Sequence, residues 1–519
     1  MSAPVPTDTG PTTSGLSGPW RGLLLLVAAL SLFRIGWLAI AARPLDVDEA
    51  QYWVWSLSLD GGYATKPPLV AWIIALGTGV FGPTAFGIKV AAPLLHAGIA
   101  LALAAVADLL SGARAALWAG AIYLTLPGVW FSATLMSTDP PMMLGWALAL
   151  FASVHWAASP SPGRAALIGL ALGLGLLGKY AAIAAVGGIT VWLVALTEAR
   201  RALSQAMVAA LVAALLLMLA PNLIWNLNHG FAAVTHVGEN AAWRDSDAVR
   251  GLDWGELGDF LVTQVLLFGP VGWIAVIGAL LAFRRRAGLF AAAPARAGVW
   301  LLLATGVPIL AVMIGQALTG KANANWAVGA YLSLSVLAGL WLAERARPVL
   351  LALLIATSAV IGIGVHGWEP IRAQLITVSS QGTDPFRRLR PYPAFSKAAV
   401  ALAAAQDAEM IVSDDRYLLS QLLFYTDWPI DQVSHITRSG KIDSVFQTLA
   451  TPDTITSKRV LYVSRRPGLT LTGTGITPLD PIIIVTHSDR QFEVNATRIM
   501  AAEPLPPLTS AQSPQDRPR

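Results

Sequence analysis

Long apolar runs fill the first two thirds of the chain and are separated by short polar connections. Eleven of these runs are close to the roughly 20 residues that a transmembrane helix requires. They lie at about 22–42, 86–110, 115–131, 140–158, 165–178, 180–197, 203–224, 259–283, 297–317, 326–342 and 348–366. The pattern predicts a polytopic α-helical membrane protein with about 11 transmembrane helices.

The first apolar run contains Ala39-Ile40-Ala41, which resembles the cleavage site of a signal peptide. The run extends from Gly22 to Ala42, whereas the apolar region of a signal peptide has only about 7–15 residues. We therefore interpret it as a retained first helix.

One further apolar segment, "PPLVAWIIALGTGVFG" at 67–82, is either a short span or a helix lying in the membrane interface. The excess of arginine and lysine in cytoplasmic connections can decide between these readings. If 67–82 does not cross, the N-terminus and the arginine-rich connections all fall on the cytoplasmic side. These connections contain Arg114, Arg164, Arg200, Arg201, Arg284–Arg286, Arg296, Arg345 and Arg347. The loop 43–85 and everything after 367 then lie on the opposite side.

The pattern changes after residue 367. The runs "AEMIVS", "RVLYVS" and "PIIIVTHS" are short and rich in β-branched residues, and polar or helix-favouring segments separate them. They predict a small soluble α/β domain over 367–502, after a membrane domain over 19–366. The polar segment 1–18 and the proline-rich segment 503–519 are predicted to be disordered tails, the first of them cytoplasmic.

Composition supports the membrane assignment. Of 519 residues, 55% are hydrophobic and only 13% are charged, with a mean hydropathy of +0.60. Soluble proteins are usually about 25% charged. The net charge of +5 is concentrated in the short connections, so it predicts the bilayer as partner and no nucleic acid. The absence of cysteine excludes disulfides and thiolate metal sites.

Several charged residues fall on the face opposite the arginines, where membrane topology does not explain them. An ionised side chain at membrane depth costs at least about 2.5 kcal/mol, so such groups usually pair or line a cavity. Lys179, in "LGKYAA", is flanked by apolar helix on both sides. We expect the carboxylates and lysines of this face to share one cavity. The polar residues of this face are Asp46, Asp48, Glu49, Lys66, Asp139, Lys179, Lys321, Asn323 and Asn325.

Each of these residues also has a structural interpretation. Asp46 and Asp48 suit the N-cap or first turn of a helix. Asp139 precedes Pro140 and suits the start of another helix. The two lysines at 66 and 179 suit interfacial positions from which they reach water. These alternatives stay open on the residue pattern alone.

Two other motifs have structural interpretations. The run "GLALGLGLLG" at 169–178 follows no strand, so it predicts close helix packing rather than a phosphate-binding loop. The segment "SDDRY", which includes Asp414 to Tyr417, follows a predicted strand. We interpret it as a turn or helix cap rather than a second site.

The motifs occur in a specific order over residues 20–345: "DVDEAQYWVW", "YATKPPLVAWIIALGTGVFG", "STDPPMML", "LGKYAA", "PNLIWNLNHGF" and "TGKANANW". In this order they resemble bacterial glycosyltransferases of the protein-mannosyltransferase superfamily, which have the GT-C fold and include aminoarabinose transferases that modify lipid A. The resemblance implies transfer of a sugar from a polyprenyl-phosphate carrier to an envelope lipid, glycan or protein. The reaction would occur at the periplasmic face of the bacterial inner membrane, usually with inversion.

The resemblance also implies roles for individual residues. Asp48 and Glu49 match the acidic pair whose first member is catalytic, and Lys66 matches a lysine near the carrier phosphate. Asp139 matches the Asp-Pro acid, and later elements match Lys179, Tyr180, Asn325 and Trp326. Aminoarabinose transferases carry a metal-associated glutamate where Thr65 stands here. We therefore expect no resident metal, although the resemblance leaves a divalent metal open.

The chemistry of transfer is consistent with these residue types. An acceptor hydroxyl must lose a proton as it attacks, so we interpret Asp48 as the general base, with Glu49 or Asp139 orienting acceptor or sugar. The departing phosphate carries negative charge that cations stabilise. Lys66, together with Lys179 or Lys321, suits this role. The alternative hypotheses are a lipid-linked sugar transporter or flippase, whose charges would form a permeation path, and a non-catalytic scaffold.

Overall fold

The structure is a computed structural model of the 519-residue chain. It describes residues 17–41, 43–231, 233, 251–291, 293–345, 348–369, 386, 389–435, 445–446, 459–464, 476–478, 483–487 and 490–499. Apart from residues 17 and 18, the predicted tails lie outside the described residues.

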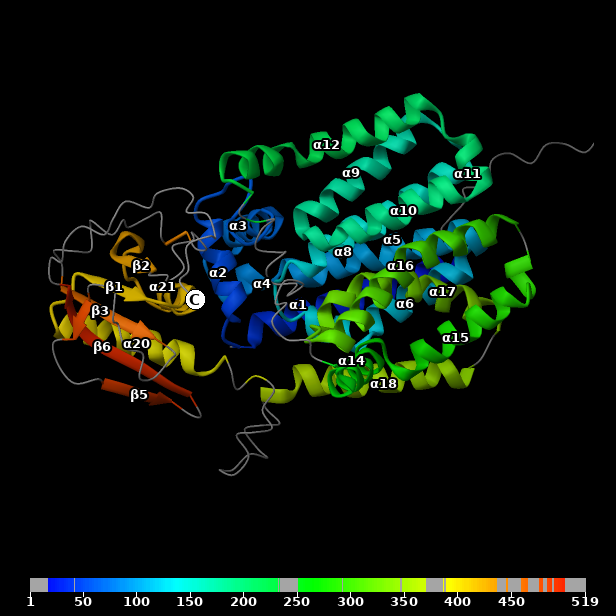
Figure 1. Ribbon diagram of the computed structural model, residues 1–519. Coiled ribbons are helices and arrows are strands. Elements are labelled where there is room, and N and C mark those ends of the chain that lie inside the picture. The colour runs from blue at the N-terminus through cyan, green and yellow to red at the C-terminus, as the bar shows by residue number, and fades with distance from the viewer. Residues whose placement is uncertain are drawn as a thin grey trace, which may run out of the picture.

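A bundle of apolar helices makes up most of the molecule (Figure 1). Its helices are α1 (Gly18–Ile40), α5 (Ala91–Ser111), α6 (Ala113–Thr125), α7 (Pro127–Ser132), α8 (Asp139–Ala158), α9 (Pro162–Gly178), α10 (Ile183–Ala195), α11 (Thr197–Ala202), α12 (Gln205–Asn228), α14 (Trp254–Phe268), α15 (Pro270–Arg284), α16 (Ala293–Thr319), α17 (Val328–Glu344) and α18 (Pro348–His366). Short 3₁₀ helices, η1 (Tyr180–Ala182), η2 (Gly288–Ala291) and η3 (Ala324–Ala327), join some of them.

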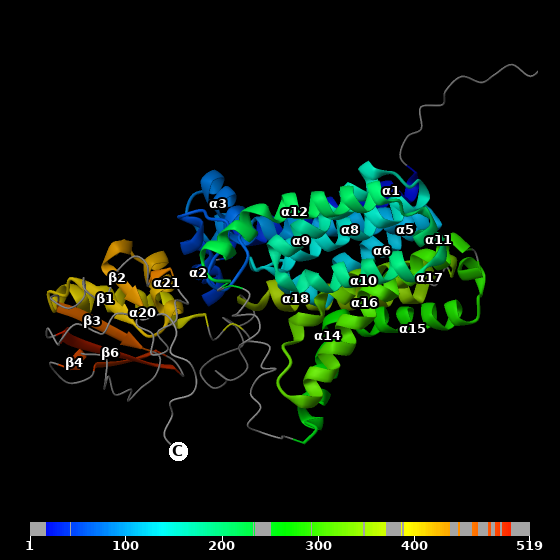
Figure 2. The same ribbon diagram turned by 45° about the horizontal axis from the view of Figure 1, so that its top comes forward.

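Three further helices lie at one end of this bundle. They are α2 (Val47–Ser56), α3 (Leu69–Phe81) and α4 (Ala85–Lys89). Figures 1 and 2 show α2 and α3 between the bundle and the strands, at the end opposite α11. The apolar side chains of Leu76 and Val80 are exposed on α3. The placement of 67–82 outside the spans stays a prediction.

Among the described residues, six helices are long and apolar enough to cross a membrane. The pair α14 and α15 would be a seventh if it is one broken span. Four shorter apolar helices, Leu69–Phe81, Pro162–Gly178, Tyr180–Ala195 and Ala356–His366, fall below that length. The prediction of a multi-pass helical membrane protein is confirmed, and the number 11 stays a prediction.

Two of the predicted spans are interrupted at a proline. The run 259–283 bends by 94° between α14 and α15. Gly269 there has a φ of +79° and is followed by Pro270, which cannot continue the helical hydrogen bonding of the preceding turn. The run 115–131 breaks at Leu126, whose extended backbone precedes Pro127, because proline disfavours helical geometry in the residue before it.

The glycine run of α9 packs against two neighbouring helices. A Cβ on Gly169 would lie 2.1 Å from the Leu211 carbonyl oxygen of α12. On the other side, a Cβ on Gly145 of α8 would lie 2.2 Å from the backbone nitrogen of Gly175. Only the missing side chains allow this approach, so the prediction of close helix packing is confirmed.

One charge inside α1, that of Arg34, is buried in the bundle and was missed in the sequence. Arg34 is buried, and its guanidinium donates to the Leu124 carbonyl oxygen at 2.7 Å. The same group lies over the Trp130 ring, 4.5 Å from the centroid, which adds a cation–π attraction. Arg34 therefore has a structural role in holding α1 against the region of α6 and α7.

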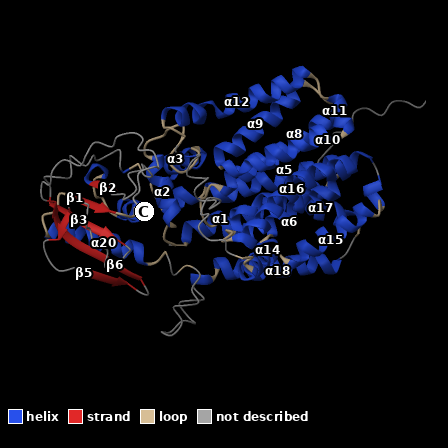
Figure 3. Cartoon of the chain, in the orientation of Figure 1, coloured by secondary structure: helices blue, strands red, loops and turns tan. Residues whose placement is uncertain are grey.

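The chain continues after the bundle with strands and helices. Figure 3 shows the strands, in red, gathered beside the helical bundle. The strands are β1 (Met410–Ser413), β2 (Val433–His435), β3 (Arg459–Ser464), β4 (Ile476–Pro478), β5 (Ile483–His487) and β6 (Arg490–Ile499). The helices are α20 (Pro391–Ala405), α21 (Arg416–Tyr425) and the 3₁₀ helix η5 (Ile430–Gln432).

The strands form one sheet in the order β2-β1-β3-β6-β4, with β5 also pairing with β6. β1 pairs parallel with β2 and β3, in the register Ile411↔Val433 and Ile411↔Leu461. β6 pairs antiparallel with β3, β4 and β5. The three runs predicted as strands are β1, β3 and β5.

Helix α21 packs directly on α2 and joins this C-terminal region to the first loop. Val54 of α2 belongs to the same apolar core as Leu418 and Leu422 of α21. The Trp53 ring meets Phe424 edge-on, with centroids 5.1 Å apart. The segment that carries the predicted acidic pair therefore lies between the bundle and the C-terminal region.

Candidate active site

The start of α2 orders the three carboxylates of the first loop. Asp46 is the N-cap, and its side chain accepts from the backbone nitrogen of Asp48 at 3.1 Å. The side chain of Glu49 in turn accepts from the Asp46 nitrogen at 2.8 Å, which completes a capping box. The structural interpretation of Asp46 is confirmed, and the Asp-x-x-Glu spacing was the signal for the second half of the box.

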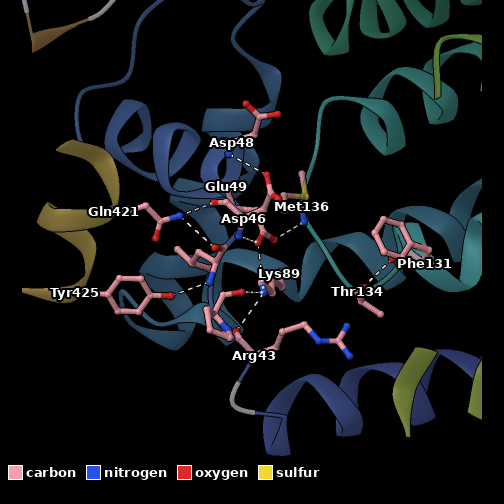
Figure 4. Close-up of polar contacts among 12 residues, drawn as sticks. Arg43, Asp46, Asp48, Glu49, Lys89, Phe131, Thr134, Met136, Gln421 and Tyr425 are labelled. Atoms are coloured by element: carbon pink, nitrogen blue, oxygen red, sulfur yellow. Dashed lines mark hydrogen bonds and ion pairs between the residues drawn. The ribbon is translucent and has the colours of Figure 1, made fainter. Parts of the chain in front are cut away.

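Glu49 is held in a buried ion pair. Its carboxylate lies 3.3 Å from the Lys89 ammonium, and both side chains are at most 5% exposed. It also accepts from the Met136 nitrogen at 2.8 Å. Figure 4 shows the Glu49 carboxylate among these donors, while the Asp48 carboxylate points to the opposite side. The predicted contact of Glu49 with substrate stays a prediction, and its described contacts join α2 to α4 and to the segment before α8.

We expect Lys89→Met to destabilise the protein markedly. Removing one partner of a buried ion pair leaves the other charge uncompensated, at a cost of about 3–5 kcal/mol. The midpoint of thermal unfolding in detergent, followed by tryptophan fluorescence, should fall. The double variant Lys89→Met/Glu49→Gln should recover part of the loss, and Lys397→Met, at an exposed lysine of α20, should unfold like the wild type. Unfolding of Lys89→Met at the wild-type temperature would contradict this account of Glu49.

Asp48 lies among groups from three parts of the chain. Burial raises the pKa of Asp48 above its ordinary value, and the Asp46 carboxylate raises it further. The cations of Lys66 and Arg416, and a hydrogen bond from Tyr417, oppose this rise in the pKa of Asp48. A carboxylate with a raised pKa is suited to accept a proton, as the predicted role of Asp48 requires.

Lys66 faces the same charges from the loop between α2 and α3. Its backbone is fixed by paired hydrogen bonds with Tyr63, of 3.1 and 3.3 Å. Burial lowers the pKa of Lys66, as does the Lys179 ammonium, while the carboxylates of Asp48 and Asp139 raise it. None of the ion pairs among the described residues involves Lys66.

Asp139 and Lys179 form the second half of the site. Asp139 begins α8, and its Oδ1 lies 2.6 Å from the Nζ of Lys179, at the end of α9. Its Oδ2 accepts from the side chain of Asn325 at 3.0 Å. Three motifs far apart in the sequence thus meet on one carboxylate. The charges of Asp48, Asp139 and Lys179 all act on the pKa of Lys66. The structure therefore brings together these four charges, which were predicted to share a site.

An amide network beside Lys179 supports the loop that carries Lys66. The Tyr180 hydroxyl donates to Asn222 at 2.9 Å and accepts from Asn226 at 3.1 Å. Asn222 in turn donates to the Gly61 carbonyl at 2.9 Å. The indole of Trp225, one helical turn on, donates to Asp60 of the same loop at 2.9 Å. The motif "PNLIWNLNHG" was noted in the sequence, but its supporting role was missed.

The other two predicted site residues, Lys321 and Trp326, form no side-chain hydrogen bond or ion pair with these charges among the described residues. The Lys321 side chain is exposed, and no described ion pair involves it. Trp326 packs with Phe260 and Met313 of α14 and α16. Their contact with substrate stays a prediction.

The residues around Lys66 do not match the donor set of a resident divalent metal. Thr65, next to Lys66, offers a hydroxyl and no carboxylate. Among the described residues, no group of three or more His, Asp and Glu side chains could hold a metal ion. Oxygen and nitrogen donors in such numbers are what these ions require.

Known proteins share the sequence pattern and the fold. A family model described as dolichyl-phosphate-mannose-protein mannosyltransferase matches residues 65–225. Lipid A galacturonosyltransferase RgtD from Rhizobium johnstonii is 34% identical over 409 residues, covering 78% of this chain and 82% of that protein. Crystal structures of ArnT from Cupriavidus metallidurans, in the apo state and bound to undecaprenyl phosphate, match with a TM-score of 0.62. They are 16% identical and cover 92% of this chain and 98% of theirs, which shows a shared fold.

The shared fold and the likeness to RgtD together define an integral-membrane glycosyltransferase of the GT-C fold. The resemblance carried by the ordered motifs is thereby confirmed. The chain belongs to the GT-C glycosyltransferase family related to the transferases that modify lipid A.

Proposed function

We propose that this enzyme transfers a sugar from a polyprenyl-phosphate carrier to an envelope lipid of the lipid A type at the periplasmic face. The meeting of Asp48, Lys66, Asp139 and Lys179 on one side of the bundle supports this function best. The ArnT crystal structure with bound undecaprenyl phosphate supports the carrier, and the 34% identity to RgtD supports the acceptor.

The proposed step is a direct displacement at the anomeric carbon of the sugar. The acceptor oxygen forms a bond to this carbon while the bond from the carbon to the phosphate oxygen breaks. The electron pair leaves with the polyprenyl phosphate, and the proton of the acceptor hydroxyl goes to the Asp48 carboxylate. Attack opposite the leaving group gives inversion.

The cations of the site act on the leaving phosphate. Negative charge grows on the phosphate as it departs, and fixed positive groups stabilise that charge. Lys66 is suited to contact the phosphate, because no described carboxylate pairs with it. Lys179 is already held by Asp139, so we assign this pair to orienting the sugar beside Lys66.

The proposed topology places the site outside the cytoplasm. Eleven spans put the N-terminus in the cytoplasm and the α2 loop, with the C-terminal α/β domain, in the periplasm. The basic residues of α11, Arg200 and Arg201, lie at the end of the bundle opposite α2 (Figure 1), which supports this orientation by the positive-inside rule.

We expect the rate of transfer to fall at low pH, with the midpoint of the fall above the ordinary pKa of aspartate. The base works only when deprotonated, so the rate falls as pH drops through the raised pKa of Asp48. Asp46→Asn removes a like charge and keeps an N-cap side chain, so the acid limb of kcat/KM should move to lower pH. Asp253→Asn, the same change at the N-cap of α14, should leave the profile in place. An acid limb that moves to higher pH in Asp46→Asn would contradict the assignment.

Reconstitution with labelled donors tests the function. Purified protein in liposomes is given polyprenyl phosphates that carry different labelled sugars, with lipid A as acceptor. Formation of a glycosylated lipid and release of polyprenyl phosphate are expected. Movement of labelled lipid across the liposome without a new glycosidic bond would instead favour the flippase alternative. Labelled glycan or protein in a mixed-acceptor assay would overturn the lipid acceptor.

A further inference from the structure

Helix α21 is hydrogen-bonded to the segment that leads into α2, the helix that carries Asp48. The side chain of Gln421 donates to the carbonyl oxygens of Leu45 and Asp46, each at 3.1 Å. The Tyr425 hydroxyl accepts from the Leu45 nitrogen at 2.8 Å. Residues four apart share a helix face, so Tyr417 lies on this face one turn before Gln421. That position places Tyr417 beside the first turn of α2.

The start of α21 is fixed by its own cap. Asp415 follows β1, and its side chain accepts from the Tyr417 nitrogen at 2.9 Å. The Asp415 nitrogen donates to the hydroxyl of Ser413, the last residue of β1, also at 2.9 Å. The interpretation of this segment as a helix cap is confirmed. The cap also orients the two side chains that follow it, which sequence reasoning missed.

These two side chains contact each other and act on the Asp48 carboxylate. The Arg416 guanidinium reaches the Tyr417 hydroxyl oxygen at 3.5 Å and lies over its ring, 5.1 Å from the centroid. A guanidinium can only donate, so the Tyr417 hydroxyl is the acceptor in this contact. The Tyr417 hydroxyl also acts on Asp48, because a hydrogen bond between the two side chains lowers the pKa of the Asp48 carboxyl.

We propose that α21 completes the active site, with Tyr417 as a positioning residue that holds and orients the Asp48 carboxylate and Arg416 as the group that orients Tyr417. The inference rests on the proposed function and adds to it. Asp48 comes from the first loop and its support from a helix after the last membrane helix. The base is therefore fully assembled only when the C-terminal region is docked on α2.

The groups around Asp48 predict the direction in which its pKa moves when each of them is removed. The groups that face Asp48 are Asp46 at the N-cap of its own helix, Tyr52 on that helix, Lys66 from the loop, and Arg416 and Tyr417 from α21. Burial is the largest influence and raises the pKa of Asp48, whereas Arg416 and Tyr417 both lower it. Removing the Arg416 guanidinium or the Tyr417 hydroxyl should raise the pKa of Asp48 further, whereas Asp46→Asn should lower it.

The test compares pH profiles of transfer for full-length Tyr417→Phe and wild type in lipid nanodiscs. A labelled polyprenyl-phosphate sugar and lipid A serve as substrates. A hydrogen bond to a charged group is worth roughly tenfold in an equilibrium, so we expect the acid limb of kcat/KM to move up by about one pH unit. The rate should fall about tenfold on that limb and less at high pH, with KM for the donor nearly unchanged.

Tyr425→Phe is the matched control, because it removes a hydroxyl from the same helix that bonds the Leu45 backbone rather than Asp48. Its pH profile should superimpose on that of the wild type. A second variant, Arg416→Met, should also move the acid limb upward, while Arg416→Lys should restore most of the wild-type position.

The outcomes separate the inference from the proposed function. A wild-type protein that transfers no sugar overturns both. Wild-type transfer, with pH profiles of Tyr417→Phe and Arg416→Met that superimpose on it, overturns the inference alone. Equal shifts in Tyr417→Phe and Tyr425→Phe would show that α21 acts only by docking, which also overturns it.

Discussion

Asp48→Asn should reduce sugar transfer about 10²- to 10⁴-fold, the range that a positioned general base contributes. The amide has nearly the shape of the carboxylate but cannot accept the acceptor proton. Asp46 provides the N-cap of α2 and Glu49 its buried anchor, so the helix should fold normally without the Asp48 charge. The measurement is single-turnover transfer in nanodiscs, together with binding of the labelled donor.

The control for this variant is Asp46→Asn, two residues away in the same turn. It should retain transfer near neutral pH, because asparagine is also a good N-cap. Undiminished turnover in Asp48→Asn would contradict its assignment as the base. Loss of donor binding in parallel with turnover would assign the residue to binding instead.

Lys66→Met should reduce transfer about 10²- to 10³-fold, the usual effect of removing one group that stabilises developing negative charge. The charges of Asp48, Asp139 and Lys179 act on the pKa of Lys66. Lys66 forms no ion pair within the described residues, and the phosphate is its proposed partner. We expect kcat to fall and KM for the polyprenyl-phosphate donor to rise, while KM for the acceptor changes little. Steady-state kinetics with each substrate varied in turn measure this split.

Lys66→Arg should recover part of the activity, because arginine also binds phosphate but places its charge differently. Lys397→Met, at the exposed lysine of α20, is the control for loss of one positive charge. An unchanged dependence of rate on donor concentration in Lys66→Met would remove Lys66 from the carrier site.

The bundle was predictable because its helices are long and apolar, and such runs have few alternative structures in a membrane. The glycine run of α9 was predictable for a related reason, since a stripe of missing side chains has little use except close packing. The Gly269-Pro270 pair is a sequence signal for a helix break, but the apolar run continues across it. Length and apolar content therefore predicted one span where the structure has a sharp bend.

The site was predictable only in part. The resemblance of ordered motifs placed Asp48, Lys66, Asp139 and Lys179 together, and the structure brings them together. The pairing of Glu49 with Lys89 was missed, because it depends on where the fold places α4, whose Lys89 side chain reaches the start of α2.

The contribution of Arg416 and Tyr417 could not be predicted from local pattern. Their motif has a complete local explanation as a helix cap, and nothing in its spacing indicates a partner in the first loop. Gln421 of the same helix contacts Leu45, 376 positions earlier in the chain. Only the docking of α21 on α2 shows that contact.

Mass spectrometry of envelope lipids tests the central claim most directly. Lipid A is compared among cells with the wild-type protein, cells without it, and cells that produce Asp48→Asn at an equal level. Our account predicts a lipid species carrying one additional sugar in the wild type, and its absence from the other two. The same lipid A masses in all three strains would contradict it.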